Sequence, residues 1–433
     1  MNATKPVPVD QLQVGMYVAQ LDRPWLETPF LFQGFYIRDE GEIAEIKSHC
    51  EHVYISRDTL PADSSAAAAP AETLSNRKNG KIPIKKRFSF RSLFERKARD
   101  EPEDSFDQTN VCYEETTPLK DEIQTASGVH EQAVATVQSV MENLKSFDNL
   151  DIGELQTAVT PMVDSVLRNP AALACLIRMQ KKDDYLYHHS LASSVWATIL
   201  GRQLGLVRTD IDAVALGAML LDVGKTQVPD HILTKPERLS EDEEKLMRRH
   251  VQFGLDILEK AGDVDSRVID MVAHHHERYN GTGYPAAIKG SDIPVFGRIA
   301  GIVDAYDAMI TPRPYAKLLS SYDAIRKLRV LADVEFQAEI VDQFTRAIGA
   351  FPTGTLVEMS TGEVAIVTRQ NRIRRLRPEV MIVMDGSGNM LDDFRLVDLD
   401  QEKVTQHGKH SLWIERGLPP GAHGIDPREF YLG

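Results

Sequence analysis

The sequence of 433 residues contains few cysteines, no long apolar run and no excess of positive charge. Its three cysteines, Cys50, Cys112 and Cys175, are far apart and odd in number, which excludes a disulfide framework and a CxxC metal site. The N-terminal stretch MNATKPVPVDQLQVG has no apolar core of signal-peptide length, so no signal peptide is expected. No later segment reaches about 18 uninterrupted apolar residues, so no transmembrane segment is expected. The net charge of −14 argues against nucleic acid as a partner, because a phosphate backbone is usually met by a basic face. Together these absences predict a cytoplasmic protein.

What the chain does contain is typical of globular proteins. It is 42% hydrophobic and 26% charged, which is enough apolar surface to form a core. Its length predicts two or three globular units. Residues 1–60 carry short alternating apolar runs separated by turn residues, which predicts a small β-rich or α+β module. Residues 61–118 are low in complexity and rich in charge, and we expect a mobile linker there.

One part of that linker is strongly basic. Residues 76–99 hold ten lysines or arginines against one glutamate. Such a segment, with Phe88, Phe90, Leu93 and Phe94 interleaved, could dock on an anionic membrane surface. A plain charged linker is the favoured interpretation.

The remaining chain changes pattern once more. From Leu119 apolar residues recur at helical spacing and strand-like alternation is scarce, which predicts one all-α domain over residues 119–350. Residues 351–433 return to β patterning, with hairpins expected about Thr361–Gly362 and Gly386–Gly388. The expected fold class is therefore multidomain and mainly α. An all-α domain would be flanked by a small N-terminal α+β module and a C-terminal β-rich subdomain.

Histidines and aspartates occur at apolar-to-polar boundaries in five separate segments of the helical domain. Asp222 ends an apolar run in MLLDVGKTQVPD, and Asp304 and Asp307 lie three residues apart on one face of an expected helix. A carboxylate in an apolar helix is costly unless it lies beside a cation or a metal. Helical folds build internal metal centres from such side chains on facing helices. Any one of these histidines or aspartates, taken alone, is more simply explained as a structural or surface residue. That explanation is weaker for all of them together, because five separate segments show the same pattern.

Four sequence blocks in order resemble the HD-GYP family, the bacterial cyclic di-GMP phosphodiesterases of the HD superfamily. The blocks are HHS at 188–190, LLDVGKTQVPDHILTKPERLS at 220–240, HHERYNGTGYP at 275–285 and IPVFGRIAGIVDAYDAMITPRPY at 293–315. The flanking regions resemble, more weakly, the N-terminal module and β-rich tail found with such domains. The resemblance implies an all-α HD-GYP domain that hydrolyses cyclic di-GMP to pGpG or GMP. Diguanylate cyclases (GGDEF proteins) or other signalling proteins are the partners it suggests.

The resemblance also implies roles for individual residues. The metal ligands would be His189, Asp222, His250, His275, His276 and Asp304. Asp222 would bridge a dinuclear iron or manganese centre, which activates water and takes charge from the phosphoryl oxygens of a phosphodiester. Lys225 would act with Asp222 in catalysis by neutralising a phosphate oxygen in the transition state. The residues expected on the substrate side are Tyr284, Asp307, Arg313 and Lys317, although a rigid turn explains Tyr284 equally well.

The chain departs from the family pattern at one metal ligand. The His-Asp pair that names the family falls at 221–222, where this sequence has Leu221 before Asp222. Leucine cannot coordinate a metal, so the site that the resemblance gives to His189 and Asp304 loses a ligand. The other site, which contains His250, keeps all of its expected ligands.

Two functional hypotheses follow from this departure, and a third is independent of it. The first is a working phosphodiesterase whose weakened site is completed by water, by His188 or by His274. The second is a catalytically inactive relative that still binds cyclic di-GMP or a partner protein. The third, a generic HD phosphohydrolase acting on nucleotides, is disfavoured because minimal HD enzymes lack the GYP loop.

Overall fold

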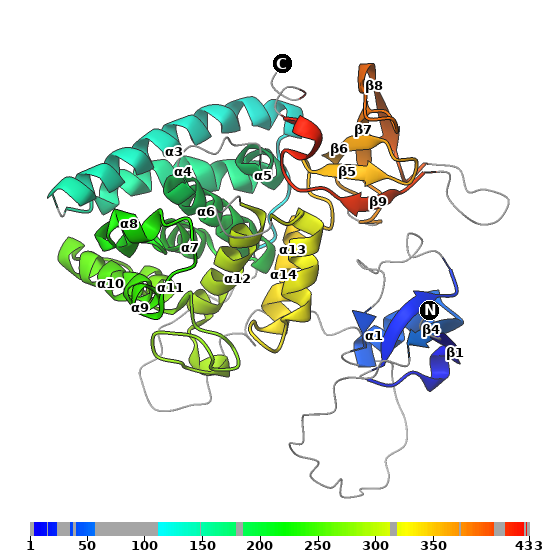
Figure 1. The fold of residues 1–433 in the computed structure, drawn as a ribbon, viewed down its shortest axis with the longest axis horizontal. Coiled ribbons are helices and arrows are strands. Elements are labelled where there is room, and N and C mark those ends of the chain that lie inside the picture. The colour runs from blue at the N-terminus through cyan, green and yellow to red at the C-terminus, as the bar shows by residue number, and fades with distance from the viewer. Residues whose placement is uncertain are drawn as a thin grey trace, which may run out of the picture. The chain divides into compact units, whose positions relative to one another are not determined.

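The computed structural model describes residues 4–14, 16–23, 35–37, 40–56, 111–147, 149–178, 185–311, 318–371, 374–401, 412–427 and 430. The chain divides into two compact units, Met1–Ser89 and Phe90–Gly433. The first contains a small sheet with one described helix, and the second contains the helices of the expected all-α domain and a C-terminal sheet (Figure 1).

The first unit is an antiparallel sheet with a helix. Its elements are β1 (Thr4–Pro8), β2 (Tyr17–Leu21), β3 (Phe35–Tyr36), α1 (Glu40–His49) and β4 (His52–Ser56). The strands lie in the order β1-β4-β2-β3. Val18 and Val53 from the sheet pack with Ile43 and Ile46 from the helix in one apolar core. The α+β form of the N-terminal expectation is therefore confirmed.

Helices make up most of the second unit. They are α3 (Leu119–Phe147), α4 (Ile152–Arg168), α5 (Pro170–Arg178), α6 (Tyr185–Leu204), α7 (Arg208–Leu220), α8 (Asp230–Leu233), α9 (Glu241–Arg248), α10 (His250–Ala261), α11 (Ser266–His274), α12 (Val295–Ile310), α13 (Ser321–Val330) and α14 (Ala338–Ile348). The first residue of α3 is Leu119, where the helical periodicity begins in the sequence. The positions that this periodicity assigned to the core, such as Val137, Met141 and Leu144, are buried.

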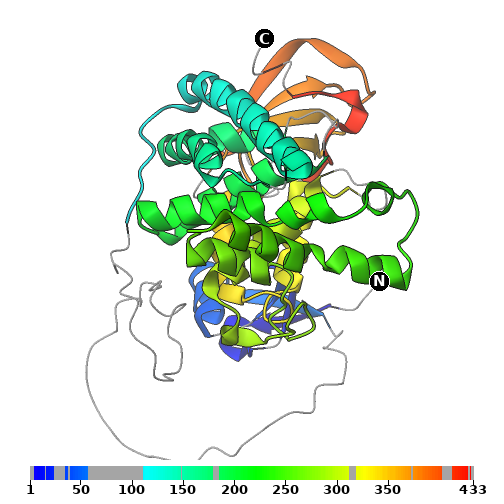
Figure 2. The same cartoon turned by 90° about the vertical axis from the view of Figure 1, so that its left-hand side faces the viewer.

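Helix α6 is the centre of this helical domain. It packs against α4, α5, α7, α12 and α14. Residues 189–201 of α6 are all buried, and a helix that is buried on every side needs an apolar or small side chain at nearly every position. Its small polar residues bond within the core, as Ser194 does by donating to the carbonyl of Ala215. The long helix α3 lies beside α4 on the outside of the domain (Figures 1 and 2).

A five-stranded antiparallel sheet follows the helices. Its strands are β5 (Leu356–Met359), β6 (Val364–Arg369), β7 (Glu379–Met384), β8 (Met390–Asp398) and β9 (Ile414–Gly417), in the order β8-β7-β6-β5-β9. The expected hairpins about Thr361–Gly362 and Gly386–Gly388 are the β5–β6 and β7–β8 connections. The multidomain, mainly α fold class is confirmed.

The expected linker, residues 61–118, lies mostly outside the described residues, and so does its basic part. Its last stretch, residues 111–118, is described and makes hydrogen bonds to the helical domain. The amide of Val111 donates to Gly205, the amide of Thr116 donates to Arg168, and the hydroxyl of Tyr113 donates to Leu206. These hydrogen bonds fix the stretch against the helices, because its polar groups find partners there. In the described part of the chain, no helix has both the length and the apolarity needed to cross a membrane.

Candidate metal centre

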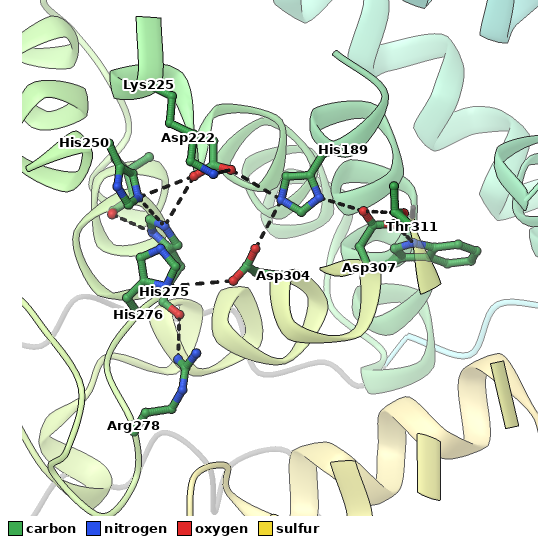
Figure 3. Close-up of polar contacts among 12 residues, drawn as sticks. His189, Asp222, Lys225, His250, His275, His276, Arg278, Asp304, Asp307 and Thr311 are labelled. Carbon is green, nitrogen blue, oxygen red and sulfur yellow. Dashed lines mark hydrogen bonds and ion pairs between the residues drawn. The ribbon is translucent and has the colours of Figure 1, made fainter. Parts of the chain in front are cut away.

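The six residues expected to bind metal come together at one place in the helical domain (Figure 3). They come from α6, from the turns after α7 and α11, from the start of α10 and from α12. Helices α6, α7, α11 and α12 pack against one another, which brings these positions together from 116 residues of sequence (189–304). The structure therefore places the predicted set in a single cluster.

A close approach of two backbone segments positions Asp222 against α10. After α7 ends at Leu220, the chain turns through Leu221 and Asp222 into a 3₁₀ turn, Val223–Gln227. A Cβ atom on Gly224 would lie 1.9 Å from the carbonyl oxygen of His250. Only glycine allows this contact, so Gly224 is the reason that the turn can seat Asp222 beside His250.

Four side chains form a compact group of metal-ligating atoms. Asp222, His250, His275 and His276 each offer one donor atom, and these atoms all lie within 4.8 Å of one another. In Figure 3, Asp222 lies between His250 and His275 on one side and His189 on the other. Mixed imidazole and carboxylate donors suit a divalent transition metal.

The hydrogen bonds of two of these histidines direct lone pairs at each other. Nδ1 of His250 bonds to the carbonyl oxygen of Met247 at 2.7 Å, and Nδ1 of His275 bonds to that of Val272 at 2.9 Å. Since a carbonyl oxygen only accepts, each Nδ1 carries the hydrogen, and each neutral ring has its lone pair on Nε2.

The two Nε2 atoms of His250 and His275 lie 3.3 Å apart. Burial lowers the pKa of His250 and lowers that of His275 to about 4, so both rings are neutral at pH 7. Two lone pairs at this distance repel unless a cation lies between them. Ligating histidines in metal sites commonly donate their other N–H to a carbonyl in this way. The donor set therefore fits a metal ion.

The two oxygens of Asp222 face different neighbours. Oδ1 lies 3.4 Å from Nε2 of His250 and, among the described residues, is buried without a hydrogen-bond partner. Oδ2 lies 2.5 Å from Nζ of Lys225 and 3.5 Å from Nε2 of His189. Burial acts to raise the pKa of Asp222, but Lys225 and then His250 hold it well below its ordinary value. Asp222 is thus an ionised carboxylate with one oxygen toward each half of the cluster.

The second half of the cluster contains His189 and Asp304, together with Oδ2 of Asp222. Nε2 of His189 lies 3.2 Å from Oδ1 of Asp304, and its Nδ1 lies 2.6 Å from Oδ2 of Asp307. Burial acts to lower the pKa of His189, but hydrogen bonds to Asp304 and Asp307 raise it to about 9. Each ring nitrogen of His189 thus lies within hydrogen-bond distance of a carboxylate. Leu221 is buried beside Asp222, and an aliphatic side chain adds no ligand to this half.

Asp307 does not lie where it was expected. It was placed on the substrate side, but its side chain is buried behind His189. Its oxygens accept hydrogen bonds from Nε1 of Trp196 at 3.0 Å and from the hydroxyl of Thr311 at 3.1 Å, besides the one from His189. With both oxygens bonded inside the core, Asp307 orients His189 and cannot reach a substrate.

Tyr284, in the GYP triplet, packs against the cluster, and its ring contacts two charged or ionisable side chains. The ring stacks on that of His276, with centroids 4.5 Å apart, and the guanidinium of Arg248 lies 4.9 Å from its centroid. Arg248 was not predicted, although its position two residues before His250 in the sequence was a usable signal. The other residues expected on the substrate side, Arg313 and Lys317, lie outside the described residues.

Glu277 holds the loop that carries Tyr284. This buried carboxylate accepts hydrogen bonds from the amides of Ala286 at 2.7 Å and Ile288 at 3.1 Å. The amide of Tyr284 in turn donates to the carbonyl oxygen of His276 at 3.2 Å. The loop is therefore fastened to the segment that supplies two of the candidate metal ligands.

Three family descriptions match consecutive parts of the chain. Residues 4–155 match a domain of unknown function (DUF3391), residues 172–340 match the HD domain, and residues 356–406 match a KOW domain associated with HD domains. The HD match contains every residue of the cluster.

Curated relatives match over different lengths. The chain is 30% identical over 406 residues to a cyclic di-GMP phosphodiesterase of Pseudomonas aeruginosa, covering 93% of this chain and 90% of that one. It is 34% identical over 151 residues to the cyclic di-GMP phosphodiesterase response regulator RpfG of Xanthomonas campestris, covering 35% and 40%. It is 32% identical over 155 residues to 3'3'-cGAMP-specific phosphodiesterase 2 of Vibrio cholerae, covering 36% and 30%.

Among solved structures, an HDG"Y"P protein of Bdellovibrio bacteriovorus aligns with 79% of this chain and 98% of its own. The sequence identity is 18% and the TM-score is 0.45.

Proposed function

This chain belongs to the HD-GYP family, and from that premise we propose that it hydrolyses cyclic di-GMP as a metal-dependent phosphodiesterase. The observation that carries the proposal is the pair of Nε2 lone pairs of His250 and His275, which face each other at 3.3 Å beside an ionised Asp222. Relatives named cyclic di-GMP phosphodiesterases support the substrate class.

A divalent metal, manganese or iron, would be held by Asp222, His250, His275 and His276. When bound, such a cation supplies positive charge to phosphoryl oxygens and lowers the pKa of attacking water. His189 and Asp304 would hold a second ion with the other oxygen of Asp222. That second ion is the weaker one in this proposal, because Leu221 provides no ligand.

The residues around the centre would bind and orient the phosphodiester. Lys225, bonded to Asp222 at 2.5 Å, keeps a positive charge at the centre and would neutralise a phosphate oxygen as charge develops. Tyr284 fixes the ring of His276 by stacking on it. Because Arg248 also lies over this ring, we assign Tyr284 to holding His276 and not to stacking on a base.

A second function is favoured by a specific observation. His189 bonds on both sides to carboxylates, and its half of the cluster has three candidate ligands, His189, Asp222 and Asp304. A family member with only three candidate ligands in this half of the cluster would still bind its ligand but would not hydrolyse it. Such a protein would bind cyclic di-GMP or a signalling partner, for example a diguanylate cyclase, in the cytoplasm.

One assay separates the two functions. The purified full chain, loaded with Mn²⁺ or Fe²⁺, is tested for hydrolysis of cyclic di-GMP and of 3'3'-cGAMP, beside the variants Leu221→His and Asp222→Asn. We expect the wild type to hydrolyse cyclic di-GMP and Asp222→Asn to be inactive. If the wild type binds cyclic di-GMP without hydrolysing it and Leu221→His hydrolyses it, the second function, a binding protein, is correct. If the wild type hydrolyses 3'3'-cGAMP faster than cyclic di-GMP, the proposed substrate is wrong.

A further inference from the structure

A cavity of about 760 Å³ lies between the helices and the C-terminal sheet. Its walls come from residues 113–119, from α5 and α6, from the end of α14 and from residues 369–371 and 375. None of the candidate metal ligands is among its described lining residues. The volume is within the range of about 300–1,000 Å³ that small-molecule sites occupy. This cavity is therefore separate from the metal centre.

The described lining is strongly basic. It contains one carboxylate, Glu115, and these arginines: Arg178, Arg202, Arg346, Arg369 and Arg375. In a chain whose net charge is −14, such a concentration of guanidinium groups is a local departure from the average. Arginine is suited to phosphate because its planar fork matches two phosphate oxygens. The charge predicts an anionic ligand, and the volume predicts one larger than a free phosphate.

Arg178 has donor groups that the described protein does not use. Its Nη1 donates to the carbonyl oxygens of Ala174 at 3.1 Å and Thr353 at 3.4 Å. Its Nε and Nη2 are buried and have no hydrogen-bond partner in the described part of the chain. These two atoms form one edge of the guanidinium, the edge by which Arg168 holds both oxygens of Glu122. Arg178 lines the cavity, and because buried donors without acceptors are costly, an anion beside this guanidinium would be favoured.

A series of contacts joins Arg178 to the metal centre. Its guanidinium lies 4.7 Å from the centroid of the fully buried Trp196 ring. Nε1 of Trp196 donates to Oδ1 of Asp307 at 3.0 Å, and Oδ2 of Asp307 accepts from Nδ1 of His189 at 2.6 Å. An anion on Arg178 would therefore act on the same core that orients His189.

We propose that this cavity is a second ligand site, which binds a phosphorylated molecule of nucleotide size and raises the metal affinity of the centre through Arg178, Trp196 and Asp307. The sign follows from charge along these contacts, since an anion that neutralises Arg178 lessens its polarisation of the Trp196 N–H. Asp307 then keeps more negative charge and supports His189 more strongly as a ligand. The site would bind its ligand whether or not the metal centre hydrolyses cyclic di-GMP.

The binding test uses the full chain stripped of metal, titrated calorimetrically with GMP and, separately, with pyrophosphate. We expect GMP to bind once per chain and pyrophosphate to bind more weakly. Arg346 is exposed on α14, so Arg346→Glu tests the cavity without disturbing the core. It should weaken GMP binding about tenfold or more. Arg326→Glu, the same change at an exposed position of α13 outside the lining, should not.

Several results would overturn the site. The proposal is wrong if GMP does not bind saturably, or if Arg346→Glu leaves GMP binding unchanged. It is also wrong if pyrophosphate binds as tightly as GMP. Loss of GMP binding in Asp222→Asn but not in Arg346→Glu would place the ligand at the metal centre instead.

The coupling test measures Mn²⁺ affinity from free Mn²⁺ by electron paramagnetic resonance, with and without saturating GMP. We expect GMP to tighten Mn²⁺ binding several-fold, within the range of about 5–150-fold typical of allosteric coupling. Trp196→Phe keeps an aromatic ring but removes the N–H that reaches Asp307. It should abolish the GMP effect while GMP itself still binds. An unchanged Mn²⁺ affinity in the wild type, or a GMP effect that survives Trp196→Phe, would contradict the coupling.

Discussion

Nδ1 of His189 and Oδ2 of Asp307 form a 2.6 Å hydrogen bond across 118 residues of sequence. The bond fixes the imidazole so that Nε2 faces Asp222 and Asp304. A carboxylate behind a ligating histidine sets the orientation of the ring and raises its basicity.

Replacing Asp307 by asparagine tests this arrangement. The side chain keeps its shape but loses its charge, so the support for His189 weakens. We expect Asp307→Asn to lower Mn²⁺ affinity or hydrolysis about 10–100-fold, the usual cost of losing such a supporting group. Thr311→Val removes one neutral hydrogen bond to the same carboxylate and should have a much smaller effect. Equal effects of the two variants would show that the charge of Asp307 is unimportant.

Replacing Gly224 by alanine should disrupt the candidate metal centre by pushing Asp222 and His250 apart. The added methyl group would meet the carbonyl oxygen of His250 at 1.9 Å and the amide nitrogen of Gly254 at 2.4 Å, both backbone atoms. We expect Gly224→Ala to lower the free energy of unfolding by about 1–3 kcal/mol, as other overpacked sites do, and to weaken Mn²⁺ binding.

The matched control is Gly128→Ala in α3, where an added Cβ meets nothing within 4 Å. In a helix interior this change should stabilise the protein by about 0.5–1 kcal/mol. Urea denaturation of both variants measures the difference, and a Gly224→Ala protein as stable as the wild type would refute the close contact.

Metal binding should stabilise the fold. A ligand that binds only the folded chain adds about 2.7 kcal/mol at 100 times its dissociation constant. We therefore expect Mn²⁺ to raise the melting temperature and EDTA to reverse the increase. His275→Ala should remove the effect because it deletes one of the four grouped ligands. His231→Ala, at an exposed position outside that group, should retain it.

Acid should weaken an ion pair between α3 and α4 whose carboxylate is buried and whose arginine is partly exposed. Glu122 accepts hydrogen bonds from Nε and Nη2 of Arg168, each at 2.8 Å, and from Ser165 at 2.7 Å. Burial acts to raise the pKa of Glu122, but the hydrogen bonds from Arg168 and Ser165 lower it below its ordinary value. Because the folded-state pKa is the lower one, this stabilisation is complete above the unfolded pKa of about 4.3 and is lost as pH falls through the folded pKa.

The variant Glu122→Gln measures that contribution. At pH 7 it should reduce the free energy of unfolding by about 1–3 kcal/mol, the cost of a broken charged hydrogen bond. The difference from wild type should shrink between pH 5 and pH 3, where the wild-type carboxylate becomes protonated. Glu131→Gln, on the exposed side of the same helix, should show no such pH dependence. A difference that stays constant with pH would exclude the ion pair as its source.

The sequence alone determined the fold class and the candidate ligands, because both depend on local patterns. Helical periodicity from Leu119 requires a buried stripe on each helix, and the β hairpins follow from glycine turns between apolar runs. The blocks containing Asp222 and His275 identify the family by residue type and order. The replacement of histidine by Leu221 is also visible in sequence alone.

Only the tertiary structure decided which side chains meet. Asp307 shares a helix face with Asp304, and sequence spacing could not show that α6 supplies His189 and Trp196 as its partners. The arginine-lined cavity likewise combines segments from residue 113 to residue 375, none of which is distinctive by itself. Residue patterns record which face of an element is buried, but the packing of distant elements determines what that face touches.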